Sequence, residues 1–125
     1  MNPMDAEAHC KLGILLRNLG RHNEAEKELR EAIRINPDDA VIHYNLGVLL
    51  IMLDRYEEAE KEFREAIRIN PDDAVVHSVL GGLLVGVGRY PEARAELERA
   101  IELFEQEGRP QDAEQSREIL EGLPE

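Results

Sequence analysis

Three histidines recur at a constant spacing in this chain, and histidine is a common ligand of zinc. They are His9, His43 and His77, each 34 residues after the one before. If equal spacing places them in equivalent positions of stacked units, neighbouring rings lie roughly one helix-packing distance apart, about 8–10 Å. A zinc ion holds its ligand atoms at about 2 Å and cannot bridge rings that far apart. We therefore predict that the histidines have a packing role and that the chain has no metal site and no cofactor.

Cys10 beside His9 has the residue types of a nucleophile and its base. Adjacent residues of a helix point in different directions, so the thiol and the imidazole would not face each other. The many Asp and Glu residues are interspersed with Lys and Arg, as on a solvated helix surface, and do not suggest paired catalytic carboxylates. We predict no catalytic residues and no enzymatic activity.

The composition narrows the class of protein. The chain has 125 residues, which is one domain by length, and a formal net charge of −12. That charge disfavours nucleic acid and anionic membrane surfaces as partners. A single cysteine cannot form an internal disulfide, and the first ten residues lack the basic and apolar segments of a secretory signal. We expect a soluble, cytoplasmic protein; the excess acid in residues 92–125 serves solubility or, alternatively, attracts a basic partner.

The stretch Glu24–His43 is almost repeated at Glu58–His77, and only two apolar positions differ between the copies. Self-similarity at a fixed period of this size is typical of stacked-repeat proteins. Extending the alignment predicts one domain, residues 1–125, with three repeats at 6–39, 40–73 and 74–107. Gly108 and Pro110 then mark a turn. We predict that residues 110–121 form a capping helix, with Ala113, Ser116 and Leu120 on one face, rather than a disordered acidic tail.

Each repeat contains two helical patterns with a breaker between them. In the second repeat the first pattern is a stripe of leucines with the spacing of one helix face, namely Leu46, Leu49, Leu50 and Leu53. The breaker is Asp54-Arg55, where the other repeats have Gly20-Arg21 and Gly88-Arg89.

The second helical pattern has an apolar inner side and a charged outer side. On the outer side, Glu60 with Arg64 and Lys61 with Glu65 have the spacing of ion pairs. The proline of Asn70-Pro71 ends this helix, and Asp72 or Asp73 can cap the next one. The third repeat has Glu105 in place of that proline, so its second helix can run on.

This pattern resembles the tetratricopeptide repeat family over about 100 residues. The residues that carry the resemblance in the second repeat are Leu46-Gly47, Tyr56, Ala59, Phe63, Ala66 and Pro71. The resemblance implies an all-α fold, an α-solenoid of antiparallel helix pairs in a right-handed superhelix, with about seven helices. It also implies that small residues such as Gly47 and Ala59 lie where helices cross, and that the first helices line a concave groove.

The resemblance places a set of side chains in that groove. In the first repeat they are Glu7, Cys10, Lys11, Ile14, Arg17 and Asn18, which are mostly polar. The later repeats supply the apolar part, which we take as the candidate binding site: Tyr44, Asn45, Val48, Ile51, Met52, Val75, Val79 and Val85. The stretch from Ala74 to Gly88 has no charged residue, and Gly82 and Gly86 would leave a shallow floor.

An apolar face without a partner usually marks an interaction site. We predict a scaffold for protein–protein interaction that binds an apolar peptide or helix of another protein in this groove. The alternative is a self-association module that pairs the same surface with a second copy. Some family members clamp the terminal carboxylate of a chaperone tail, but of the clamp positions here only Asn45 matches, so we expect no such partner.

Overall fold

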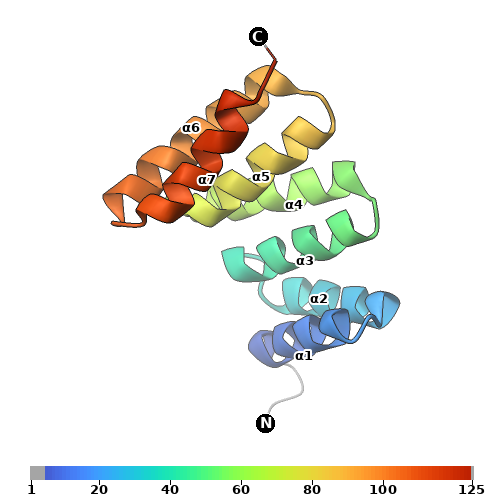
Figure 1. Cartoon of the computed structure of the whole chain (residues 1–125). Coiled ribbons are helices and arrows are strands. Elements are labelled where there is room, and N and C mark those ends of the chain that lie inside the picture. The colour runs from blue at the N-terminus through green and yellow to red at the C-terminus, as the bar shows by residue number, and fades with distance from the viewer. Residues whose placement is uncertain (1–4, 125) are drawn as a thin grey trace. The chain divides into compact units, whose positions relative to one another are not determined.

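The computed structural model of the protein describes residues 5–124, and its regular structure within that range is entirely helical (Figure 1). Seven helices follow one another there without a strand. They are α1 (Ala6–Asn18), α2 (His22–Ile35), α3 (Ala40–Met52), α4 (Tyr56–Ile69), α5 (Ala74–Gly86), α6 (Tyr90–Gln106) and α7 (Pro110–Glu121). The predicted fold class, an all-α solenoid of antiparallel helix pairs, is confirmed.

One aspartate precedes the first helix of each repeat and caps its N-terminus. Asp5, Asp39 and Asp73 precede α1, α3 and α5, and each carboxylate accepts a hydrogen bond from the backbone N–H two residues on, at 2.9–3.0 Å. Such a cap satisfies one of the N–H groups that a helix start leaves without a partner. Of the two aspartates that the sequence offered before α5, the one that caps is Asp73.

The breakers between paired helices are tight turns in a left-handed backbone conformation. Gly20, Gly88 and Gly108 have φ values of 78°, 80° and 71°, which glycine adopts without steric cost. Asp54 takes the same conformation at φ 59° although it has a side chain. Its carboxylate accepts a hydrogen bond from the Tyr56 hydroxyl at 2.9 Å, which ties the turn to the start of α4.

The helices fall into two compact units, α1–α4 up to Ile69 and α5–α7 from Asn70 onward. In the first unit the pairs α1/α2 and α3/α4 are joined by the packing of α3 against α2 and α1. In the second unit α5 pairs with α6, and α7 packs against α6. The grouping of all residues into one domain of three repeats stays a prediction.

The last helices of the second unit follow the sequence pattern closely. Helix α6 has 17 residues where α2 and α4 have 14, so it does run on where the proline is missing. On α7, Ala113 and Ser116 are buried and Leu120 is half-buried, as the predicted inner face requires. The guanidinium of Arg109 lies 4.8 Å from the centre of the Phe104 ring, a cation–π contact at the turn between the two helices.

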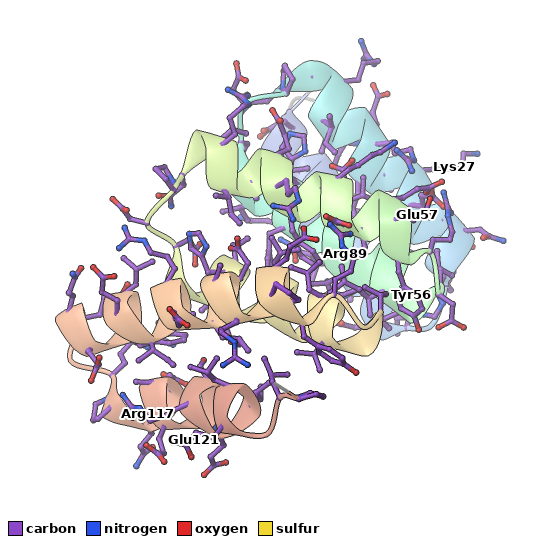
Figure 2. The ribbon with its side chains drawn as sticks, turned by 90° about the horizontal axis from the view of Figure 1, so that it is seen from above. Lys27, Tyr56, Glu57, Arg89, Arg117 and Glu121 are labelled. Atoms are coloured by element: carbon purple, nitrogen blue, oxygen red, sulfur yellow. The ribbon has the colours of Figure 1, made fainter. Side chains whose placement is uncertain are left out.

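The second helices carry their charges on the outer side, where Lys27 and Glu57 point away from the ribbon (Figure 2). The predicted pair of Glu60 with Arg64 is present at 2.9 Å. The carboxylate of Glu65, however, bonds Arg68 at 2.5 Å rather than the predicted Lys61. A turn of helix places i,i+3 neighbours as close as i,i+4 neighbours, and the Arg68 guanidinium donates to Oε1 of Glu65 from both Nε and Nη2.

One glycine in each first helix lies where the paired helices approach most closely. A Cβ added at Gly47 would lie 2.7 Å from an atom of the Phe63 ring. At Gly81 it would lie 2.8 Å from Cγ of Leu97, and at Gly13 2.7 Å from Cγ of Leu29. These distances are shorter than any carbon–carbon contact, so glycine is required for the observed separation of the helices.

Helix α5 allows this requirement to be tested with a matched pair. Gly81→Ala is expected to lower the free energy of unfolding by about 1–2 kcal/mol, because overpacking outweighs the better helix propensity of alanine. Gly82→Ala is expected to raise it by up to about 1 kcal/mol, since nothing lies within 4 Å of the added carbon. Urea unfolding followed by circular dichroism measures both. Equal effects of the two changes would show that helix contact at Gly81 is not the cause.

Candidate functional site

The three equivalent histidines link the two helices of their own repeat. Nδ1 of His9, His43 and His77 lies 2.8, 2.8 and 2.7 Å from a carboxylate oxygen of Glu28, Glu62 and Glu96, always 19 residues further on. Nε2 of His43 and His77 lies 2.7 and 2.8 Å from the carbonyl oxygens of Pro37 and Pro71, in the turn before each helix. Each ring therefore joins a first helix to its second helix, and in the last two repeats also to the preceding turn.

These contacts favour the charged form of His43 and His77. Both ring nitrogens face oxygen acceptors, and an imidazole that donates from both nitrogens is the protonated form. The hydrogen bond that His43 donates to the Glu62 carboxylate raises the pKa of His43; burial opposes this rise, and the hydrogen bond to the Pro37 carbonyl adds to it. Glu96 and Pro71 raise the pKa of His77 in the same way. Across residues 5–124, no three His, Cys, Asp or Glu side chains are grouped so as to hold a metal ion.

The structure does not assemble the pair of Cys10 and His9. Cys10 is 6% exposed, and the Nδ1 atom of His9 is held by Glu28. Burial raises the pKa of the Cys10 thiol, as does the nearby charge of Asp39. A buried thiol with a raised pKa is a poor nucleophile.

In the first unit, groove-side residues of α1 and α3 meet. Nη1 of Arg17 donates to Oδ1 of Asn45 at 3.3 Å, and Nδ2 of Asn45 donates to the carbonyl oxygen of Val41 at 2.8 Å. The Asn45 side chain is thus buried and bonded at both ends of its amide. It positions α3 against α1, so its role in any partner binding would be indirect.

The other candidate residues of α3 form a graded apolar surface. Tyr44 is half-buried, with its ring tilted against that of Phe63 at a centroid distance of 5.9 Å. Val48 and Ile51 are also half-buried. Met52 is 49% exposed, and Val41, at the opposite end of the helix, is 62% exposed. Exposure of large apolar side chains at both ends of one helix is what a docking surface would need.

In the second unit, the candidate residues lie on α5, and α7 covers part of the same side. Oγ of Ser78 lies 3.2 Å from Oγ of the buried Ser116 on α7. Val75 packs against the buried cluster that α6 and α7 share, which includes Phe104 and Ala113. Val79 and Val85 are half-buried, whereas Gly82 and Gly86 are exposed, with nothing within 4 Å of an added Cβ. The accessible part of α5 therefore centres on the two glycines.

Two features of these surfaces were not predicted from the sequence. The first is the contact of α7 with α5, because the presence of serines at 78 and 116 in the sequence does not predict that the two helices meet. The second is a set of exposed leucines on α1: Leu12 at 43%, Leu15 at 54% and Leu19 at 62%. The spacing of these leucines, at alternating intervals of three and four residues, was the signal that the sequence did contain for the latter.

Antiparallel helix pairs with a glycine at each crossing define a helical-repeat protein, a class whose open surfaces serve contacts between proteins. A family model described as tetratricopeptide repeat matches residues 16–81 and again residues 55–116. The chain belongs to the tetratricopeptide repeat family, as the resemblance of its second repeat indicated. No curated protein matches it in sequence.

Solved structures show the same fold at low sequence identity. The TPR domain of Arabidopsis OM64 is 22% identical, with a TM-score of 0.82 and 93% of each chain covered. The Yersinia enterocolitica type III secretion translocator chaperone SycD is 17% identical, with a TM-score of 0.84 over 92% of this chain and 80% of SycD. YrrB, a TPR protein described as having an unusual peptide-binding site, is 26% identical, with a TM-score of 0.77 over 83% of this chain and 54% of YrrB.

None of the helices described here combines the length and the apolar character needed to cross a membrane.

Proposed function

We propose that this protein is a non-enzymatic scaffold whose first helices bind an apolar peptide or helix of another protein. The main support is helix α5, which has no Asp, Glu, Lys or Arg, keeps His77 buried, and exposes Gly82 and Gly86 to solvent. An apolar helix is usually covered on all sides, and an open, uncharged side favours a partner. The peptide-binding site attributed to YrrB, a structural relative, is consistent with this mode.

The proposed contact residues differ in what they contribute. On α3, Tyr44, Val48, Ile51 and Met52 supply apolar area, and Asn45 holds the helix in place. On α5, Val79 and Val85 flank the glycines, and Val75 lies at the edge that α7 adjoins. Without side chains at Gly82 and Gly86, the partner's backbone can approach α5 closely. The partner is then recognised by shape and apolar contact rather than by charge.

The test uses changes that separate binding from folding. Peptides selected from a random phage-displayed library against the intact chain serve as probes, and calorimetry measures their affinity. Met52→Glu and Gly82→Gln are each expected to lower the affinity for such peptides roughly tenfold or more. Each factor of ten corresponds to a loss of about 1.4 kcal/mol in binding free energy. Gly82→Gln should at the same time stabilise α5, because glutamine has the higher helix propensity. The control is Lys61→Ala, on the exposed outer side of α4.

Three outcomes would contradict the proposal. They are a failure to select any peptide, selected peptides that bind equally well to both groove variants, and peptides that depend on Lys61 instead. Sedimentation across a range of concentrations addresses self-association through the same surface. A dimer that Met52→Glu dissociates would support self-association in place of peptide binding, and a monomer at all concentrations would exclude it.

A further inference from the structure

Helix α1 lies at the edge of the first unit (Figure 1), and one side of it carries an apolar stripe whose three leucines are exposed. The stripe consists of Ala8, Leu12, Leu15 and Leu19, and its alternating spacing of four and three residues is that of a seam between two packed helices. The three leucines are 43%, 54% and 62% exposed. Helix α1 packs against α2 and α3 through its other sides.

The same unit contains the covered version of this stripe. The residues 34 positions further on are Ile42, Leu46, Leu49 and Leu53 of α3. The first three are at most 1% exposed, and Leu53 is half-buried. The helix that precedes α3 and packs against it is α2, whereas α1 has no preceding helix among the described residues. Helix α2 therefore shows what kind of element covers such a stripe.

Charges at the edge of the stripe specify this element further. Arg55, after α3, donates to Glu58 in its own repeat at 2.5 Å and to Glu26 of α2 at 2.8 Å. Its equivalent Arg21 makes the corresponding contact within its own repeat, to Glu24 at 2.6 Å. No described residue supplies a counterpart of Glu26 to Arg21, whose side chain is 55% exposed against 38% for Arg55.

A second charge relation points the same way. Arg30 of α2 lies 3.7 Å from Glu58, and the residue equivalent to Glu58 is Glu24. Glu24 and Arg21 both line a surface hollow of about 360 Å³ between α1 and α2, with Leu12 and Leu16 as its apolar wall. A helix with a glutamate four residues ahead of an arginine, beside an apolar stripe, would match both charges at once.

We propose that the face formed by Leu12, Leu15, Leu19 and Arg21 binds an amphipathic helix of another polypeptide in the manner in which α2 packs on α3. The partner has an apolar stripe and, beside it, the glutamate and arginine that Glu26 and Arg30 represent in α2. This site is separate from the proposed groove, because Leu12, Leu15 and Leu19 lie on a different side of α1 from Arg17, which contacts Asn45.

The probe that tests this site is a fluorescent synthetic peptide with the sequence of residues 21–36, added to the intact chain. Fluorescence anisotropy is expected to show saturable binding. Leu15→Glu and Leu19→Glu in the chain should each weaken it roughly tenfold or more. The matched control is Val41→Glu, since Val41 is as exposed as Leu19 but lies on α3. Met52→Glu, which tests the groove, should leave this binding unchanged.

A charge exchange tests the orientation of the peptide. Arg21→Glu in the chain should weaken binding of the peptide. Replacing Glu26 of the peptide by arginine should then restore the lost affinity. Binding that survives both leucine changes would mean that the peptide replaces α2 on α3, and it would overturn the proposal. So would the absence of saturable binding, or a dimer of the chain that Leu15→Glu dissociates, since a second copy would then cover the face.

Discussion

Phe63→Ala is expected to lower the free energy of unfolding of the first unit by about 3–5 kcal/mol, the largest loss expected from any single substitution considered for this protein. The Phe63 side chain is fully buried between α4 and α3. It fills the space that Gly47 leaves, and its ring lies against that of Tyr44. Alanine would remove this contact and leave a cavity that rigid neighbouring helices fill only in part.

Urea unfolding measures this loss, and the matched control is Tyr56→Ala. Tyr56 is an aromatic residue of the same helix but is 41% exposed, and it contacts Asp54 through a hydrogen bond at the surface. Its replacement is expected to cost about 1 kcal/mol or less. If the two substitutions lower the free energy of unfolding equally, burial at the helix crossing is not the reason for the contribution of Phe63 to stability.

The crossing also predicts a specific coupling between two residues. Gly47→Ala alone should destabilise the unit, because the added carbon lies 2.7 Å from the Phe63 ring. With Phe63→Ala already present, the same change should be neutral or stabilising, since the ring is gone and alanine favours the helix. The resulting coupling energy is expected to exceed about 1 kcal/mol, within the range found for residues in contact. Simple additivity of the two changes would contradict this account of the glycine.

The fold followed from the sequence because its period is local and repeated. The spacing of the leucines predicted the first helices, and Asn70-Pro71 predicted the end of a second helix. The aspartates predicted where the first helices start. Asp54 is an example in which the repeat, and not the residue type, predicts the backbone. It has the positive φ of Gly20 and Gly88, its equivalents in the other repeats, although it is not a glycine. Repetition constrains such a position more strongly than the preference of a single residue.

The candidate site was less predictable because exposure depends on contacts far apart in the sequence. Asn45 was expected to face a partner, yet Arg17 and Val41 engage its amide. Val75 was expected in an open groove, yet α7 returns to that side of α5. The histidine links, by contrast, could have been found, because a glutamate follows each of the three histidines at a constant distance of 19 residues.

Those histidine links predict that the protein loses stability as the pH rises above neutrality. The pKa of His43 and of His77 is raised in the folded state, from an ordinary value of 6.5. The folded protein then binds more protons than the unfolded chain between the ordinary and the raised pKa. The stabilisation is fully present below about pH 6.5 and is lost as the pH rises through the folded-state pKa. Within that window each histidine lowers the free energy of unfolding by at most about 1.4 kcal/mol per pH unit.

The charged groups that face the two histidines do not titrate in this pH window. Around His43 the facing groups are Glu62 and Glu65, and around His77 they are Glu96 and Arg99. Carboxylates lose their charge only at lower pH, and arginine remains charged throughout the window. Glu26, whose pKa Arg55 lowers, contributes stability that disappears only as the pH falls toward that pKa. The loss that begins near pH 6.5 therefore belongs to the imidazolium groups, whereas the raised pKa of the Cys10 thiol adds a loss only above its ordinary value of 9.0.

Glu62→Gln combined with Glu96→Gln should flatten the pH profile without removing either histidine. A neutral amide still occupies the carboxylate's place, but it no longer favours the imidazolium form, so the histidine pKa values fall. At pH 6 the double variant should be less stable than the wild type by about 1.5–3 kcal/mol per link, the usual range for a hydrogen bond to a charged group. At a pH above the raised histidine pKa values the two proteins should differ much less, because the wild type has then lost its imidazolium groups as well.

The exposed Glu57 of α4 provides the control, since Glu57→Gln removes one carboxylate, as each of the two changes does, without touching a histidine. Its pH profile should match that of the wild type. Titration of the ring protons by NMR gives the pKa of each histidine directly. A value for His43 or His77 at or below 6.5 would mean that the ring is neutral between Glu62 or Glu96 and the proline carbonyl. One of the two oxygens would then face a nitrogen without a proton, and the links could not stabilise the repeat in the way their geometry requires.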